Sequence, residues 1–206
     1  DQDGVGPRDP VDRPARHEDI EQTCRAAEAK ARGASAITSV NLSTVLGEVL
    51  PENAIYVDET TSHRGRNQRH IPYRGPGSYI RTPSGLGQGL GLSLGVKLAS
   101  PDRPVVSLFG DGSFLYNPTL PALGFARDEK LPIMIVVYNN RGYRAMRNNH
   151  LSYYPKGVAA QHRIFLGETL NGPDYHELAK MFGGVGISVQ DPAKLKQALE
   201  QGYSAV

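Results

Sequence analysis

Three runs of consecutive apolar residues, each ending in polar residues, stand out along the chain. They lack the apolar-polar alternation of a half-exposed strand, so they are predicted to be strands buried on both faces. The runs are AIYVD (54–58), PVVSLFG (104–110) and PIMIVVYNN (132–140). Helical patterns are found at about 42–50, 117–128 and 175–182, and the stretch from 141 to 172 is expected to be irregular. Alternating strands and helices predict an α/β fold, with a doubly wound parallel sheet and helices on both faces.

The front of the chain has a different composition. Residues 1–16 combine charges with Pro7, Pro10 and Pro14, and are predicted to be an exposed linker. Residues 17–32 are rich in helix formers and are followed by Gly33, so a short solvent-exposed helix is expected. We therefore predict that residues 1–35 are a linker and helix at the end of a preceding domain.

Three glycines recur every fourth residue in the segment SGLGQGLGLSLGVKLA. On a helix, Gly87, Gly91 and Gly95 would line one face with bare backbone, which predicts close approach of another element or a ligand there. A dinucleotide-binding G-x-G-x-x-G motif is not met, because Leu90 stands where the last glycine of the motif would be.

Charge and composition exclude several classes of protein. A net charge of +2 is too small to indicate nucleic-acid binding, and the basic run at 64–74 lacks the interleaved aromatic residues of a single-strand binder. That run is predicted to be a solvated face or a subunit contact. No apolar run approaches the roughly 20 residues of a membrane helix, and the single cysteine, Cys24, fits a reducing compartment, so a cytoplasmic protein is expected.

The histidines show no metal-ligand spacing, and most are expected at the surface, with His150 near the pocket. They are His63, His70, His150, His162 and His176.

Polar residues follow two of the predicted strands directly. Asp111 comes after the second strand and Asn140 after the third, separated by one helix and one strand. A crossover of this size returns the chain to the same sheet edge, where ligands of parallel sheets bind, so the two side chains are expected to converge. Carboxylate and amide oxygens suit Mg²⁺, which phosphate groups and water usually complete. Gly110, Gly112 and Ser113 would let backbone and a hydroxyl approach a diphosphate.

These motifs resemble those of the thiamine diphosphate-dependent 2-oxo acid decarboxylases and acetolactate synthases, and most closely the benzoylformate decarboxylase type. The resemblance rests on GDGSF followed by a crossover and NN, and on PENAIYVDETTS, PGSY, SGLG, GVKLASPDRPVV and LAKMFG. It runs from about residue 41 to the end of the chain. It implies that residues 36–206 are the diphosphate- and Mg²⁺-binding domain, without the family's last strand.

The resemblance also implies a set of site residues. Mg²⁺ would be held by Asp111, the side chain of Asn140 and the carbonyl of Gly142. Ser84 would accept a hydrogen bond from the aminopyrimidine through its carbonyl, and Leu86 would hold the cofactor bent. The other cofactor contacts implied are Thr61, Ser62, Gly110, Gly112, Ser113 and Tyr143, and the substrate-pocket residues are Ala145 and Asn149.

The implied reaction is non-oxidative decarboxylation of a small 2-oxo acid, with carboligation as a side activity. Thr61 and Ser62 favour the decarboxylases, because the synthases carry Gly-Gln-His after this strand, whereas Asn148 and Asn149 replace bulky aromatics and favour a smaller or more polar substrate. An acetolactate synthase-like carboligase and a non-catalytic module with a relic site are the alternatives. The family's catalytic glutamate lies in a pyrimidine-binding domain, so activity would need that domain from another segment or chain, in a homo- or hetero-oligomer (dimer or tetramer).

Overall fold

The fold is built on a parallel four-stranded sheet in the order β2-β1-β3-β4. It was obtained as a computed structural model, which describes residues 13–83 and 85–206. The strands are β1 (Ile55–Glu59), β2 (Tyr79–Arg81), β3 (Val105–Gly110) and β4 (Met134–Tyr138). Glu59 pairs with Phe109, and Gly110 pairs with Tyr138, so the carboxyl ends of three strands meet at one edge.

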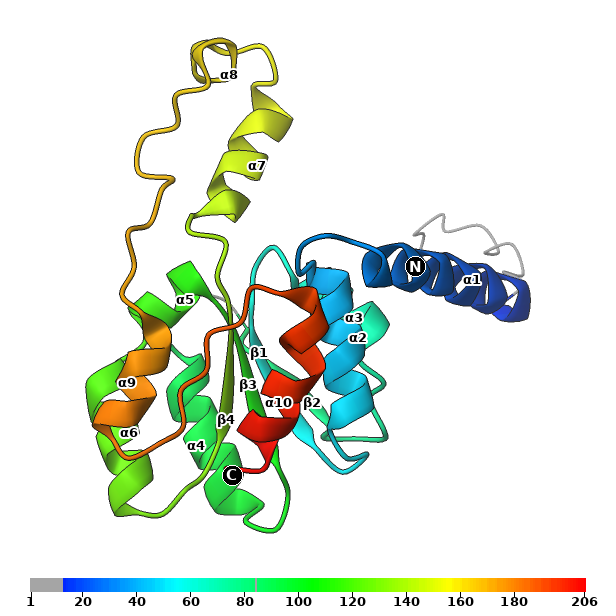
Figure 1. The fold of residues 1–206 in the computed structure, drawn as a ribbon. Coiled ribbons are helices and arrows are strands. Elements are labelled where there is room, and N and C mark those ends of the chain that lie inside the picture. Colours follow the sequence, from blue (N-terminus) through cyan, green and yellow to red (C-terminus); the bar gives the residue numbers. More distant parts are fainter. Residues whose placement is uncertain (1–12, 84) are drawn as a thin grey trace, which may run out of the picture.

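Helices cover both faces of the sheet (Figure 1). Tyr56, Val106 and Val136 face α2 (Ser39–Val49) and α10 (Leu195–Tyr203) in the larger hydrophobic core. The opposite face packs against α4 (Gly89–Ala99), α6 (Thr119–Asp128) and α9 (Tyr175–Met181). Successive strand residues point to opposite faces, so strands covered on both faces need apolar residues at nearly every position. The predicted doubly wound sheet is confirmed.

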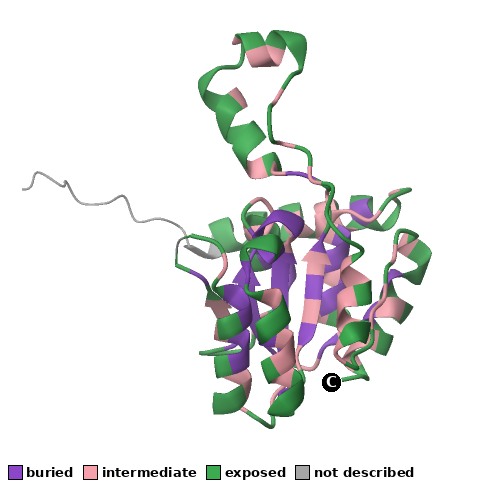
Figure 2. Cartoon of the chain, turned by 90° about the vertical axis from the view of Figure 1, so that its left-hand side faces the viewer, coloured by how far each residue is buried: buried purple, intermediate pink, exposed green. Residues whose placement is uncertain are grey.

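Several elements differ from the sequence predictions. The helix expected at 117–128 is two helices, because α5 (Asp111–Tyr116) begins directly after β3 and Pro118 precedes α6. The stretch expected to be irregular contains α7 (Arg144–Tyr153) and α8 (Val158–His162), which rise above the body as an arm of mostly exposed residues (Figures 1 and 2). The remaining elements are α3 (Arg64–His70), within the predicted basic run, and the 3-10 helix η1 (Pro192–Lys194).

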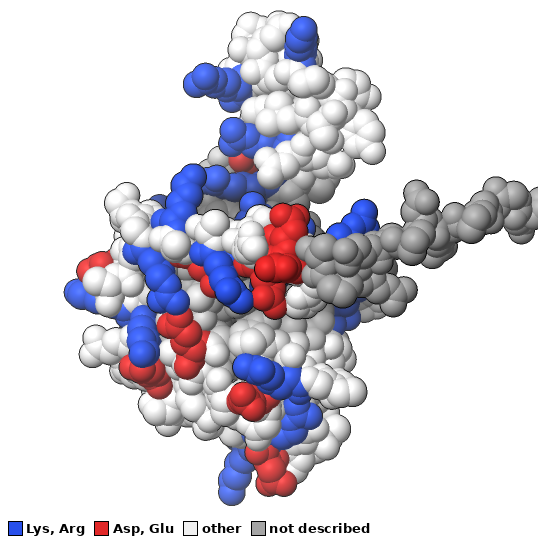
Figure 3. Space-filling model, turned by 90° about the vertical axis from the view of Figure 1, so that its right-hand side faces the viewer, with Lys and Arg blue, Asp and Glu red and all other residues white. Residues whose placement is uncertain are grey.

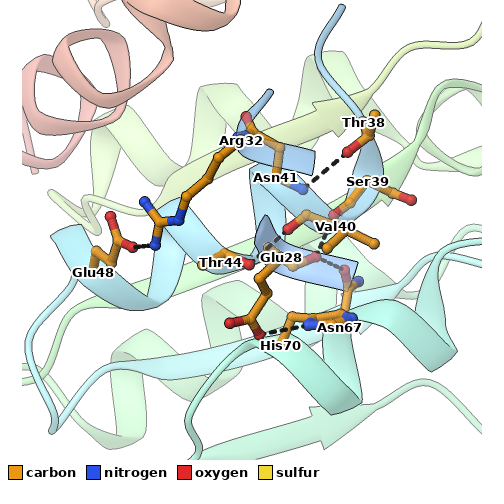
Figure 4. Close-up of polar contacts among 11 residues, drawn as sticks. Glu28, Arg32, Thr38, Ser39, Val40, Asn41, Thr44, Glu48, Asn67 and His70 are labelled. Carbon is orange, nitrogen blue, oxygen red and sulfur yellow. Dashed lines mark hydrogen bonds and ion pairs between the residues drawn. The ribbon is translucent and has the colours of Figure 1, made fainter. Parts of the chain in front are cut away.

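The first helix is longer and better anchored than predicted. α1 (Arg13–Arg32) includes the last four residues of the predicted linker, and residues 1–12 lie outside the described part of the chain. Its carboxyl end docks on the sheet domain, because Glu28 bonds the buried His70 at 2.8 Å and Arg32 pairs with Glu48 on α2 (Figure 4). The prediction that His70 is a surface residue is therefore wrong.

The predicted glycine stripe is only partly a close-packed face. Gly87 precedes α4, and a Cβ added at Gly91 or Gly95 would meet no atom within 4 Å. Close approach occurs instead at Gly89, where a Cβ would lie 2.5 Å from both Phe109 Cε1 and Glu59 Oε2. The first residue of the helix, and not its later turns, touches the sheet.

This contrast gives a matched pair of substitutions. Gly89→Ala is expected to lower the free energy of unfolding by about 1 to 3 kcal/mol, because it overpacks the contact with Phe109. Gly91→Ala, at an open and exposed position of the same helix, is expected to raise it by about 0.5 to 1 kcal/mol. Denaturant unfolding of both variants measures the two changes, and equal effects would contradict the packing described.

Candidate functional site

The edge of the sheet formed by the ends of β3 and β4 gathers the central polar residues. Asp111 is 2% exposed, and its two carboxylate oxygens accept one backbone hydrogen bond each. The N–H of Gly112 donates to Oδ1 at 2.9 Å, and the N–H of Gly142 donates to Oδ2 at 3.0 Å. Asp111 therefore ties the start of α5 to the loop after β4.

Asn140 places an unpaired oxygen at the same point. Its Oδ1 is buried without a hydrogen-bond partner among the described residues, and lies 3.9 Å from where a Cβ on Gly142 would stand. Its Nδ2 is 3.4 Å from Nε2 of His63. The side chains of Asp111 and Asn140 thus converge on the backbone of Gly142, as the strand-end argument predicted.

The loop that carries Gly142 leaves no room for a side chain. A Cβ there would lie 2.8 Å from the carbonyl oxygen of Glu168, because Gly142 forms a bridge with Thr169. Arg141, directly before it, has a φ of +55°, in the left-handed region that non-glycine residues rarely adopt. The backbone between Asn140 and Tyr143 is therefore held in one tight conformation.

These donors fit a hard divalent cation. A carboxylate, an unpaired amide oxygen and a backbone carbonyl are the ligand types that Mg²⁺ takes, usually with phosphate and water. The carbonyl of Gly142 accepts a hydrogen bond from the N–H of Arg144 at 2.9 Å, and a carbonyl oxygen has a second lone pair. Among the described residues, no group of three or more His, Cys, Asp or Glu could hold a metal, but the present donors do not depend on such a group.

Aromatic residues surround this centre. The ring of Tyr143 fills the space beside Gly112, where a Cβ would lie 2.6 Å from its Cε1. Tyr143 also lies against Tyr116, with ring centroids 6.4 Å apart, and burial followed by Tyr116 raises its pKa. A Cβ on Gly87 would lie 2.6 Å from the carbonyl oxygen of Tyr116, which brings the loop with the 36% exposed Leu86 to the same region.

The predicted diphosphate contacts lie at the ends of β1 and β3. Ser113 is buried, and its hydroxyl donates to the carbonyl of Gly110 at 3.0 Å. Thr61 is exposed and Ser62 half-buried in the loop after β1, and the carbonyl of Ser62 accepts a hydrogen bond from Arg66. The residue that follows them, His63, reaches Asn140.

Other predicted residues are not brought to this centre. Ser84 lies outside the described residues. Ala145 is half-buried and Asn149 exposed, and both lie on α7, in the arm that rises from the site (Figure 1). In Figure 3, basic and acidic side chains lie side by side over the body, while those on the arm are mainly Lys and Arg.

Two residues near the site were missed from sequence. Glu59 ends β1, is 1% exposed, and accepts hydrogen bonds from the N–H groups of Gly87, Gln88 and Gly89 and from Asn117. His63 was predicted to be a surface residue, but it is half-buried and its ring stacks on Tyr138. Burial lowers the pKa of His63, and the Arg66 guanidinium lowers it further, so the neutral ring is favoured. The signal for both was their position after an apolar strand.

The fold and the site define a protein that binds a small polar ligand at the carboxyl edge of a parallel sheet. The family described as "Thiamine pyrophosphate enzyme, C-terminal TPP binding domain" matches residues 59–205. The chain belongs to this family. Among the described residues, no helix combines the length and hydropathy needed to cross a membrane.

Curated relatives and solved structures agree with the family. Benzoylformate decarboxylase of Pseudomonas aeruginosa is 36% identical over 104 residues, which are 50% of this chain and 19% of that protein. Acetolactate synthase isozyme 3 large subunit of Escherichia coli is 35% identical over 152 residues, 68% of this chain and 25% of that protein. The thiamine diphosphate-dependent 4-hydroxybenzoylformate decarboxylase of Rhodococcus jostii superposes with a TM-score of 0.73 at 31% identity, covering 84% of this chain and 31% of that one. The chain thus spans between a fifth and a third of these relatives.

Proposed function

We propose that the chain is the diphosphate-binding part of a thiamine diphosphate- and Mg²⁺-dependent 2-oxo acid decarboxylase. The observation that carries this proposal is the buried, unpaired Oδ1 of Asn140 beside the carboxylate of Asp111. An unpaired buried oxygen costs about 1 to 3 kcal/mol, which a bound cation would remove. Asp111, Asn140 and the carbonyl of Gly142 would hold Mg²⁺.

The remaining residues would hold and orient the cofactor. Thr61, Ser62 and Ser113 would donate hydroxyl hydrogen bonds to the diphosphate, and the backbone of Gly110 and Gly112 would lie along it. Tyr143 would close this side of the site. When bound, thiamine diphosphate supplies the electron sink that stabilises negative charge at the carbonyl carbon of a 2-oxo acid.

On the other side, Leu86 would hold the cofactor's two rings in their reactive orientation, and the carbonyl of Ser84 would accept a hydrogen bond from the aminopyrimidine. The exposure of Leu86 supports this role, because its side chain is available to a ligand.

Decarboxylation of the benzoylformate type, with carboligation as a side activity, is favoured over acetolactate synthesis. Thr61 and Ser62 after β1 support this choice, as does the likeness to the Pseudomonas and Rhodococcus decarboxylases. Ala145 and Asn149 on α7 would face the substrate once the arm is covered. The basic side chains of the arm favour an anionic substrate such as a small 2-oxo acid.

A second domain would complete the site. The arm exposes large apolar side chains, with Met146 67% and Leu166 95% exposed, and such groups are commonly covered by a partner. We propose that a pyrimidine-binding domain, on another segment or chain of a dimer or tetramer, covers them and supplies the catalytic glutamate. The single, half-buried Cys24 supports work in the reducing cytoplasm.

Calorimetric titration of the 206-residue chain with thiamine diphosphate tests the proposal. Binding is expected with Mg²⁺ present and at least about tenfold weaker with EDTA, because the cation links the diphosphate to the protein. Binding that ignores Mg²⁺ would contradict the proposed ligand set. No binding in the presence of an added pyrimidine-binding domain would favour a non-catalytic module with a relic site.

A further inference from the structure

We infer that His63 is a positioning residue that orients the amide of Asn140, so that Oδ1 and not Nδ2 faces Asp111 and Gly142. The inference rests on the proposed function, because it concerns how well this amide is prepared for a cation. The direct observation is the contact of 3.4 Å between Nδ2 of Asn140 and Nε2 of His63.

An asparagine amide has two chemically opposite ends. Its oxygen accepts, and its NH₂ group donates and repels a cation, yet a half-turn of the terminal torsion exchanges them with little change in shape. A fixed acceptor beside Nδ2 removes this ambiguity, because only one orientation of Asn140 then satisfies the NH₂ group. In that orientation the Oδ1 of Asn140 is the buried oxygen without a partner.

His63 is itself held in place by a buried network. Its ring stacks on Tyr138 with centroids 5.0 Å apart and planes 21° apart. The hydroxyl of Tyr138 donates to Oδ1 of Asn67 at 2.9 Å, and Nδ2 of Asn67 donates to Oδ2 of Asp58 at 3.2 Å. Asp58 and Asn67 are both fully buried. The position of the acceptor is therefore fixed from β1, α3 and β4 together.

Two substitutions separate the functions of the ring. His63→Phe keeps a flat ring to stack on Tyr138 but removes the acceptor, and His63→Gln keeps an acceptor without the ring. Mn²⁺, followed by its electron paramagnetic resonance signal, reports metal affinity in the presence of saturating thiamine diphosphate. His63→Phe is expected to weaken Mn²⁺ binding by about 10- to 100-fold, the usual effect of losing an outer partner of a metal ligand. His63→Gln is expected to recover part of this loss.

A double-mutant cycle with Asn140→Ala tests whether His63 acts through Asn140. If it does, His63→Phe changes Mn²⁺ affinity by less than about twofold once the amide is gone, because the two effects are not additive. Equal losses from His63→Phe in the two backgrounds would overturn the inference, since His63 would then act on the ligand directly. An unchanged affinity in His63→Phe alone would overturn it as well.

The control is His162→Ala, at an exposed histidine at the end of α8, which is expected to bind Mn²⁺ like the parent chain. Failure of the parent chain itself to bind Mn²⁺ with the cofactor would overturn the proposed function, and with it this inference. Binding by the parent together with additive losses would overturn the inference alone.

Discussion

Exchanging Asp111 for asparagine is expected to weaken Mg²⁺-dependent binding of thiamine diphosphate by at least about 100-fold. The change removes the negative charge at the centre of the proposed metal site, and losing even an outer partner of a metal ligand costs about 10- to 100-fold. The asparagine keeps one oxygen that can accept the N–H of Gly142, a bond of 3.0 Å in the parent. The fold should therefore survive, and calorimetric titration with and without Mg²⁺ measures the loss.

The matched control makes the same chemical change at the opposite edge of the sheet. Asp102 is exposed in the turn between α4 and β3, so Asp102→Asn is expected to leave cofactor binding unchanged. Thermal unfolding of both variants checks that neither has lost its structure. If Asp111→Asn bound the cofactor with Mg²⁺ as tightly as the parent does, the metal site would have to lie elsewhere.

Much of the fold follows from the apolar runs in the sequence. β1, β3 and β4 were predicted because a strand covered on both faces needs apolar residues at nearly every position. β2 was not, because it has three residues at the sheet edge and pairs only with β1. α7 was missed for a related reason, since none of its residues is buried and its sequence carries no core-facing pattern.

The site was predictable where it depends on strand ends. Asp111 and Asn140 follow neighbouring parallel strands, and topology alone brings them together. His63 and Glu59 were missed because their partners lie far away in the sequence and are set by tertiary structure. Glu59, for example, accepts from the N–H of Gly87, 28 positions later. Such a contact leaves no periodic signal.

Replacing Glu59 with alanine is expected to lower the free energy of unfolding by about 3 kcal/mol or more. The carboxylate is the acceptor for the first N–H groups of α4 and for Nδ2 of Asn117, and α4 begins without a side-chain cap of its own. A buried donor left without an acceptor costs about 1 to 3 kcal/mol, and several lose theirs at once. Favourable interaction of the negative charge with the amino end of the helix is lost as well.

Two further variants separate this explanation from a general loss of packing. Glu59→Gln keeps the volume and one acceptor oxygen but loses the charge, so its loss should fall between those of the parent and Glu59→Ala. Glu52, 80% exposed and paired loosely with Arg74 at 3.6 Å, gives the control, because Glu52→Ala should change stability by no more than about 0.5 kcal/mol. Urea unfolding measures all three. A loss below about 1 kcal/mol in Glu59→Ala would mean that water replaces the carboxylate at the start of α4. The loop with Leu86 would then be held in place by something other than Glu59.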